Sequence, residues 1–304
     1  MNTRAATAAS PAPSPLPGLL LATFGAIAFS GKAIIVKLAY RYGVDAVTLI
    51  MYRMLFALPM FVLLAWWAGR GKAALERRDW IAVAGLGFCG YYLASFLDFA
   101  GLAYVTASFE RLVLYLNPTM VLLLGWVVFR RHVTARQLLA LAISYSGVLL
   151  VFGHELRVEG SNVMLGATLV FGSALSYAIY LVYSGEVVKR IGSLRLTGLA
   201  TTVACLLCIA QFALLRPLSV AAAVAPEVIW LSVLNATLCT FAPVLMVMMA
   251  IERVGSTLTA QTGMLGPMST ILMGVLLLGE PFTAWVAAGT VLVLGGVWLL
   301  ARWR

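Results

Sequence analysis

Residues 117–135, NPTMVLLLGWVVFRRHVTA, and residues 266–284, GPMSTILMGVLLLGEPFTA, are two versions of one segment. A shift of 149 positions places residues 78–153 on residues 227–302 without a gap, and nearer the N-terminus the shift is 147. The matched pairs include Pro118 with Pro267, Gly125 with Gly274, Thr134 with Thr283 and Gly147 with Gly296. The chain is therefore an internal duplication.

The composition indicates that both copies lie in a membrane. Of the 304 residues, 62% are hydrophobic and 11% are charged, and the mean hydropathy is +1.00. A soluble domain is about half apolar and about a quarter charged. A chain this apolar has too little polar surface for water, so lipid is its expected solvent.

The sequence predicts an all-α polytopic membrane protein with ten transmembrane helices. About 20 apolar residues cross the hydrocarbon core, and the expected spans are 17–40, 46–68, 80–103, 105–129, 134–153, 163–185, 196–215, 228–251, 256–279 and 283–301. Residues 1–16 are expected to be a disordered cytoplasmic tail, and the two repeats to occupy 17–153 and 163–302. Because each repeat has an odd number of spans, the second enters the membrane from the opposite side. Such inverted repeats are typical of alternating-access carriers.

Basic residues predict the orientation. With the N-terminus in the cytoplasm, about 14 Lys and Arg fall in inner segments and about 4 in outer ones. Both termini are then cytoplasmic. The formal charge of +10 is explained by this bias and by anionic headgroups, so no nucleic-acid partner is expected.

Five ionisable residues fall inside the expected spans of the first half: Lys32, Arg53, Asp98, Glu110 and Arg111. From the rise per residue, all five are expected in the outer half of the membrane, and their counterparts in the second repeat are uncharged. Charge in a membrane marks a pathway or site by default. In one interpretation, Asp98 pairs with Arg111, and Glu110 with Lys32 or Arg53, as a structural gate. In the other, three cations against two anions leave one positive group for a substrate carboxylate.

Two prolines and several polar or aromatic residues are expected near the same depth in the membrane. Pro118 and Pro267 are expected near the middle of corresponding spans, where they would deprive Leu114 and Gly263 of helical partners and act as hinges; a packing kink is the alternative. The further candidates for substrate binding or gating are Tyr91, Ser95, Tyr115, Tyr177, Tyr180, Asn235 and Gln261. They would line a cavity or a helix contact.

Other readings are weaker. Gly85, Gly87 and Gly90 match G-x-G-x-x-G, but no strand precedes them, so helix packing is the preferred interpretation. A membrane enzyme lacks support, since the only histidines, His132 and His154, are expected in connections. No catalytic residue, metal site or cofactor is predicted. A channel or scaffold stays possible from residues alone.

The repeat ending resembles that of the drug/metabolite transporter superfamily, in its branch with two EamA-type repeats. The matching stretches are Asn117-Pro118…Gly125…Thr134…Gly147 and Gly266-Pro267…Gly274…Gly279-Glu280-Pro281…Thr283…Gly296, although Arg130-Arg131-His132 replaces the usual turn in the first repeat. Overall, the chain is most similar to the YddG-type exporters of aromatic and other amino acids.

The resemblance implies a central cavity lined by spans one to four and six to nine. It also implies export of amino acids from the bacterial inner membrane; efflux of other metabolites or cationic drugs is the alternative. The expected partners are a small-molecule substrate and the lipid bilayer, with the carrier a monomer.

Overall fold

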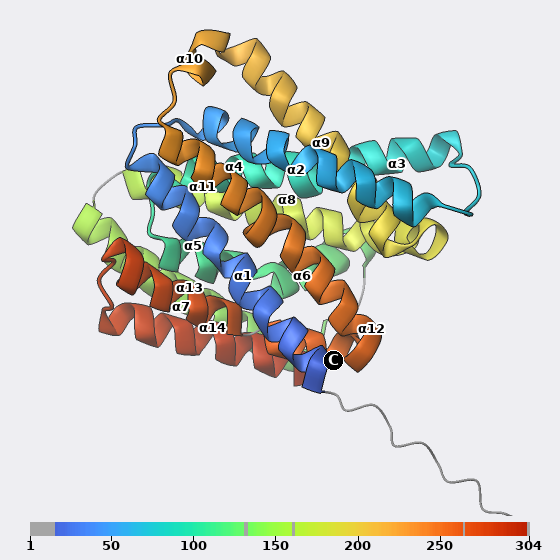
Figure 1. Cartoon of the computed structure of the whole chain (residues 1–304). Coiled ribbons are helices and arrows are strands. Elements are labelled where there is room, and N and C mark those ends of the chain that lie inside the picture. Colours follow the sequence, from blue (N-terminus) through green and yellow to red (C-terminus); the bar gives the residue numbers. More distant parts are fainter. Residues whose placement is uncertain (1–15, 131–132, 160–161, 264, 303–304) are drawn as a thin grey trace, which may run out of the picture.

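The computed structural model describes residues 16–130, 133–159, 162–263 and 265–302 (Figure 1), and these residues form helices and short connections without a β-strand. The first half contains α1 (Leu16–Tyr40), α2 (Ala46–Gly69), α3 (Arg77–Gly87), the π-helix η1 (Phe88–Leu93), α4 (Ala94–Leu102), α5 (Ala107–Leu114), α6 (Asn117–Phe129) and α7 (Ala135–Glu159). The second contains α8 (Asn162–Ile191), α9 (Ser193–Leu215), α10 (Leu218–Ala222), α11 (Pro226–Ala236), the π-helix η2 (Thr237–Phe241), α12 (Ala242–Gly263), α13 (Leu265–Met273), the π-helix η3 (Gly274–Leu278) and α14 (Ala284–Arg302).

The repeated residues have repeated structural roles. The hydroxyl oxygens of Thr134 and Thr283 each accept a hydrogen bond from a backbone N–H three residues later, at 3.3 Å, and so cap α7 and α14. Arg130 and Gly279, also 149 positions apart, both adopt left-handed backbone conformations, with φ of 51° and 73°. Such a residue ends a helix and is usually glycine. The duplication therefore preserves the turn before each last span.

Corresponding helices of the two halves run antiparallel. Gly147 of α7 meets Gly289 of α14, whereas earlier in α7 Ala140 and Ser144 meet Gly296. Likewise α2 lies against α9, with Met54 next to Cys205. In the duplication, α1 corresponds to α8 and α4 corresponds to α12. The contact of α1 with α12 therefore has its counterpart in the contact of α8 with α4. This geometry is that of two inverted repeats.

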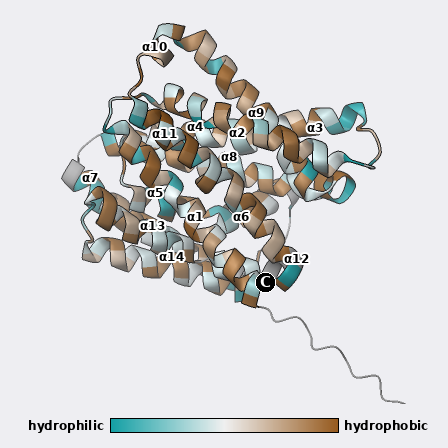
Figure 2. Cartoon of the chain, in the orientation of Figure 1, coloured by the Kyte–Doolittle hydropathy of each residue, from teal (hydrophilic) through white to brown (hydrophobic). Residues whose placement is uncertain are grey.

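Bulky apolar side chains cover the outside of the bundle. Leu214, Leu276, Val127 and Val291 are among the many that are exposed, and apolar residues follow the helices while hydrophilic ones gather near several helix ends (Figure 2). This surface is suited to lipid rather than water, so the chain is a multi-pass membrane protein.

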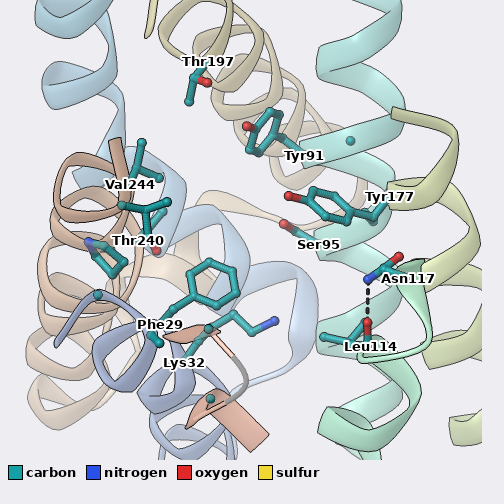
Figure 3. Close-up of a pocket in the computed structure, with 18 of the residues that line it drawn as sticks. Phe29, Lys32, Tyr91, Ser95, Leu114, Asn117, Tyr177, Thr197, Thr240 and Val244 are labelled. Carbon is teal, nitrogen blue, oxygen red and sulfur yellow. Dashed lines mark hydrogen bonds between the residues drawn. The ribbon is translucent and has the colours of Figure 1, made fainter. Parts of the chain in front are cut away.

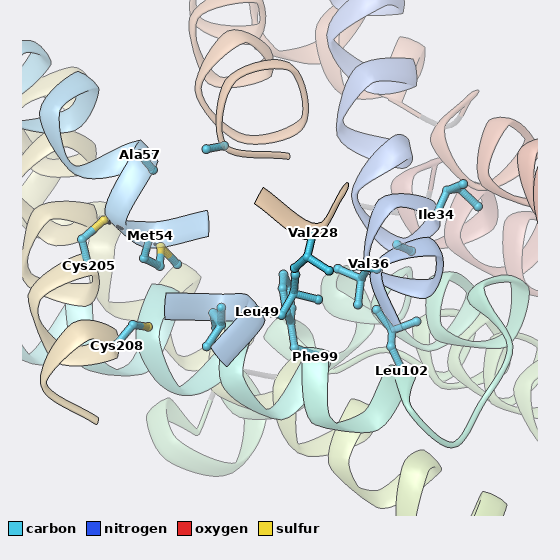
Figure 4. Packing of buried hydrophobic residues seen from close by; sticks show 14 of the residues in the cluster. Ile34, Val36, Leu49, Met54, Ala57, Phe99, Leu102, Cys205, Cys208 and Val228 are labelled. Atoms are coloured by element: carbon cyan, nitrogen blue, oxygen red, sulfur yellow. Dashed lines mark hydrogen bonds between the residues drawn. The ribbon is translucent and has the colours of Figure 1, made fainter. Parts of the chain in front are cut away.

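The interior holds apolar clusters between spans. Figure 4 shows one that joins Met54, Phe99 and Val228 to the two cysteines of α9, Cys205 and Cys208. The cysteines are free and buried, and they act there as small packing residues.

Several expectations need correction. Within the described residues, nine helical stretches are long and apolar enough to cross a membrane, and Leu265–Leu278 is shorter. The expected ninth span, 256–279, does not appear as one helix, because α12 continues through the expected connection to Gly263; residue 264 lies outside the described residues.

Residue 16 already belongs to α1, while the rest of the expected tail is not described. His154 lies inside α7 rather than in a connection, and His132 is not described.

Candidate functional site

A cavity of about 710 Å³ lies between the two repeats. Its wall comes from α1, α2, η1, α4, α5 and α6 of the first half and from α8, α9, η2, α12 and α13 of the second. Neither α7 nor α14 contributes a described lining residue. The lining from spans one to four and six to nine, expected from the family resemblance, is thus confirmed.

The cavity extends toward the end of the bundle that holds the start of α1 and the end of α14 (Figure 1). On α1 the lining residues run from Ala22 to Lys32, and on α9 they are Thr197 and Thr201, in its first turns. We call this the open end, and the opposite end of the bundle the closed end.

Most of the predicted site residues meet at this cavity. The lining includes Lys32, Arg53, Tyr91, Ser95, Asp98, Arg111, Tyr115, Tyr177 and Tyr180. Glu110 and Asn235 are almost fully buried but are not in the lining, and neither are Pro118 and Pro267. The side chain of Gln261 lies outside the described residues.

Three of the buried charges form one ionic cluster. Lys32 Nζ lies 2.5 Å from Asp98 Oδ2 and 3.3 Å from Glu110 Oε1. The expected pairing of Glu110 with Lys32 is confirmed, and that of Asp98 with Arg111 is wrong. Lys32 lies on α1 between the two acids, and its ammonium group therefore forms an ion pair with each.

Arg111 joins α5 to helices of both halves instead. Its Nε donates to Thr270 Oγ1 at 2.9 Å, and its Nη2 approaches the carbonyl oxygens of Phe29 and Ser30 at 3.4 Å each. Its nearest acid is the adjacent Glu110, at 4.0 Å. Arg111 thus has polar neighbours on α1 and α13.

Arg53 is the cation without an acid. Its Nε donates to Thr240 Oγ1 at 3.1 Å, and its guanidinium lies over the Phe99 ring at 5.1 Å. Among the described residues it has no ion pair, and its buried Nη1 has no hydrogen-bond partner. Of the two interpretations from sequence, the structure contains elements of both: an ionic cluster and one cation left over.

Tyrosines and other aromatic side chains form much of the wall. The hydroxyls of Tyr91 and Tyr180 lie 3.1 Å apart, and Tyr177 stacks on Tyr180 with ring centroids 5.5 Å apart. In Figure 3, Tyr91 and Tyr177 face the same space as Phe29 and Lys32. The cavity therefore presents flat apolar faces next to charged groups.

Two π-helical turns lie at equivalent places beside the cavity. η1 and η2 begin 149 positions apart, at Phe88 and Thr237. Ser176 of α8 donates to the carbonyl of Cys89 in η1 at 2.8 Å, and Thr240 donates to the carbonyl of Asn235 at 2.8 Å. A π-turn widens the helix and often occurs at functional sites. Here the hydroxyls satisfy carbonyls at each widened turn.

The glycines of the rejected nucleotide motif lie in and next to η1. Added side-chain carbons at Gly87 and Gly90 would collide with α9 and with Tyr180, whereas Gly85 has open space. Close packing therefore explains the second and third glycines but not the first.

The helix of the fourth span is interrupted near Pro118, as the sequence predicted, but the interruption comes just before the proline. α5 ends at Leu114 and α6 begins at Asn117, so Pro118 lies in the first turn of α6. The Asn117 amide donates to the carbonyl of Leu114 at 2.6 Å (Figure 3). That carbonyl is the one that Pro118 deprives of its usual partner. Sequence reasoning missed this cap, although Asn117 directly precedes the proline.

Glu280 holds the closed end together, and sequence reasoning missed this role too. Its Oε1 accepts from Ala107 N at 2.7 Å, and its Oε2 accepts from Ser108 N at 3.2 Å and Ser108 Oγ at 2.8 Å. The carboxylate of the second repeat thereby caps the N-terminus of α5 in the first. A negative group is favourable there. The available signal in the sequence was the position of Glu280 in the turn at residues 278–281, Leu-Gly-Glu-Pro, which belongs to the stretch that resembles the family.

Further contacts across the closed end come from the last turn of α1 and from the residue that follows it. Lys37 Nζ donates to the carbonyl of Val105 at 2.9 Å, and Arg41 Nη2 donates to the carbonyl of Leu278 at 2.8 Å. These bonds join α1 to the segments before α5 and after α13. The closed end is therefore held by both repeats.

Comparison with known proteins agrees with this architecture. A crystal structure of another protein superposes with a TM-score of 0.63 over 95% of this chain and 98% of that one, at 16% identity. At this identity the likeness shows the fold alone.

Sequence relatives carry transporter names. The chain is 30% identical to the uncharacterized transporter YcbK of Bacillus subtilis (strain 168), over 86% of each chain. It is 24% identical to an uncharacterized transporter of Archaeoglobus fulgidus, over 92% of this chain and 96% of that one. The model of the EamA-like transporter family matches twice, at residues 16–153 and 164–302. The chain therefore belongs to the EamA-like transporter family.

Proposed function

We propose that this transporter exports amino acids, aromatic ones included, by alternating access. The observation that carries the proposal is one cavity shared by two inverted repeats, extending toward one end of the bundle and blocked at the other. Two similar units with opposite orientations supply two similar closures, which can take turns. One chain encloses the cavity, so the proposed transport unit is the monomer.

The aromatic wall supports an aromatic or amphipathic cargo. Tyr91, Tyr177 and Tyr180 offer ring faces and hydroxyls on one side of the cavity, and Phe29 offers a ring on another. Aromatic rings favour offset or edge-to-face contacts with other rings. The cavity volume of about 710 Å³ is within the range of small-molecule sites.

The charges favour a carboxylate over a cationic drug. The lining has three basic side chains but one acidic one, Asp98, and Asp98 already pairs with Lys32. A cationic drug would bring a further positive charge next to Arg53 and Arg111. Export of cationic drugs is therefore the weaker alternative.

The distribution of basic residues supports a cytoplasmic position for the open end. The open end holds the α2–α3 connection with Arg70, Lys72 and Arg77, and the positive-inside rule assigns this end to the cytoplasm. The cavity would then load from the cytoplasm. We propose the bacterial inner membrane as its location, with both termini cytoplasmic.

Transport of a substrate panel by purified protein in liposomes tests the function. The panel contains radiolabelled phenylalanine, tyrosine, a small aliphatic amino acid and a cationic dye, with counterflow as the readout. We expect counterflow of at least the aromatic amino acids and none of the dye. Movement of the dye alone would refute amino acid export and favour the drug alternative.

A further inference from the structure

Several buried polar atoms of the cavity wall have no hydrogen-bond partner among the described residues, and one of them belongs to a cation without an ion pair. Arg53 is 6% exposed and lines the cavity, and its Nη1 has no hydrogen-bond partner among the described residues. An unsatisfied buried charge is costly in a membrane. A costly group that persists without a partner needs an explanation.

The fold does not require a charge at this place. The corresponding position in the second repeat lies near Thr201, which is buried on α9 and also lines the cavity. The corresponding helix of the second repeat thus packs with a neutral side chain at this place. Arg53 is therefore specific to one half of the cavity, as expected of a ligand contact rather than a scaffold residue.

The guanidinium of Arg53 is held through its Nε, whereas its Nη1 is buried without a hydrogen-bond partner among the described residues. Thr240 accepts from its Nε and is itself fixed by its bond to the carbonyl of Asn235, while Phe99 supports the flat face. A guanidinium donates two parallel hydrogen bonds to a carboxylate, and it keeps its charge at any physiological pH. Fixing one edge prepares the other for such a ligand.

No ion pair joins Arg53 to the nearby acids among the described residues. Asp98 Oδ2 accepts from Lys32 while its Oδ1 is buried without a hydrogen-bond partner, and Glu110 lies between Lys32 and Arg111, outside the cavity lining. Three cations and two anions leave one positive charge uncompensated. One carboxylate from the cargo would balance the cluster.

We infer that Arg53 binds the carboxylate of the transported molecule and thereby restricts transport to carboxylate-bearing substrates. This inference rests on the proposed function and names the residue that recognises the cargo. The tyrosine wall then receives the side chain of the cargo.

The test compares three probes that share a phenyl ring. L-phenylalanine has a carboxylate and an ammonium group, 3-phenylpropionate has the carboxylate alone, and phenethylamine has the amine alone. Each is titrated as a competitor of labelled phenylalanine counterflow in liposomes. We expect phenethylamine to compete about 10- to 100-fold more weakly than 3-phenylpropionate, the range for losing a charged hydrogen bond.

Variants of Arg53 test whether the preference for carboxylate probes depends on this residue. Arg53→Gln should weaken competition by both carboxylate probes about 10- to 100-fold and leave phenethylamine unchanged. Arg53→Lys should restore part of the affinity, because the charge remains without the fork. The matched control is Arg216→Gln, which removes an arginine that contacts Asp45 outside the cavity and should leave all three probes unchanged.

The melting temperature separates binding from structural support. Loss of an unpaired buried cation should leave the melting temperature of Arg53→Gln equal to or above that of the wild type, whereas a structural arginine would lower it. Equal competition by phenethylamine and 3-phenylpropionate, or wild-type affinity in Arg53→Gln, would overturn the inference while amino acid transport stood. If the wild type moved no amino acid, the proposed function would fail with it.

Discussion

Replacing Lys32 with Met should destabilise the protein more than removal of any single surface charge. Lys32 Nζ lies 2.5 Å from Asp98 and 3.3 Å from Glu110, and all three side chains are at most 8% exposed. At an effective dielectric constant of about 20, contacts of this length are each worth roughly 5–7 kcal/mol of attraction. Desolvation of the ammonium group offsets several kcal/mol of that. The net loss should be about 3–5 kcal/mol, as when one partner of a buried pair is removed.

The assay is thermal or denaturant unfolding of purified protein in one detergent. Lys37→Met is the matched control, because Lys37 lies on the same helix and, within the described part of the chain, donates to the neutral carbonyl of Val105 without an ion pair. It should cost about 1 kcal/mol. The double variant Lys32→Met with Asp98→Asn should recover part of the loss, since one unpaired carboxylate is gone. If Lys32→Met unfolded like the wild type, or like Lys37→Met, the cluster would not be a buried ionic site.

Four further substitutions test how the carrier moves. Glu280→Gln should weaken the cap on α5 by about 1–2 kcal/mol and shift the population toward opening of the closed end, which spectroscopic distances across that end would detect; an unchanged distance distribution would count against its role. Arg111→Ala should reduce flux per folded molecule, because its bond to Thr270 and its contacts with α1 are lost; wild-type flux from well-folded protein would show that these contacts are dispensable. Pro118→Ala and Pro267→Ala should each slow transport and favour opposite states, since their helices correspond in inverted repeats; identical shifts would mark both prolines as packing features.

The large-scale architecture could be predicted because it depends on regular patterns. Apolar windows, the ungapped shift of 149 positions over residues 78–153 and the distribution of basic residues each average over many side chains. The repeated threonines and glycines have the roles that their types favour, as caps and close contacts. Errors appear where local sequence is weakly informative, as in the connection that α12 continues through.

Most of the cavity-lining candidates could be predicted from the sequence, whereas only one of the two expected ion pairs, Glu110 with Lys32, was predicted correctly. Spacing along a helix gives the depth of Lys32, Asp98 and Arg111, but partner choice depends on how the helices are rotated and on which rotamers fit. The π-turn η1 receives a hydrogen bond from Ser176 of another helix, and this long-range contact has no local pattern in the sequence. Glu280 lies 172 positions from Ser108, and only the inverted packing brings them together.

Alternating access itself is tested most directly by the reactivity of two single cysteines from each side of the membrane. Met248→Cys lies in the cavity lining and Ser108→Cys is buried at the closed end, each in a background without the four native cysteines. In sealed vesicles without substrate, an impermeant maleimide should label Met248→Cys only from the side of the chain termini and Ser108→Cys from neither. During counterflow, Ser108→Cys should become reactive from the opposite side. Labelling of both cysteines from one side, or no labelling of Ser108→Cys during transport, would contradict a cavity that opens to the two sides in turn.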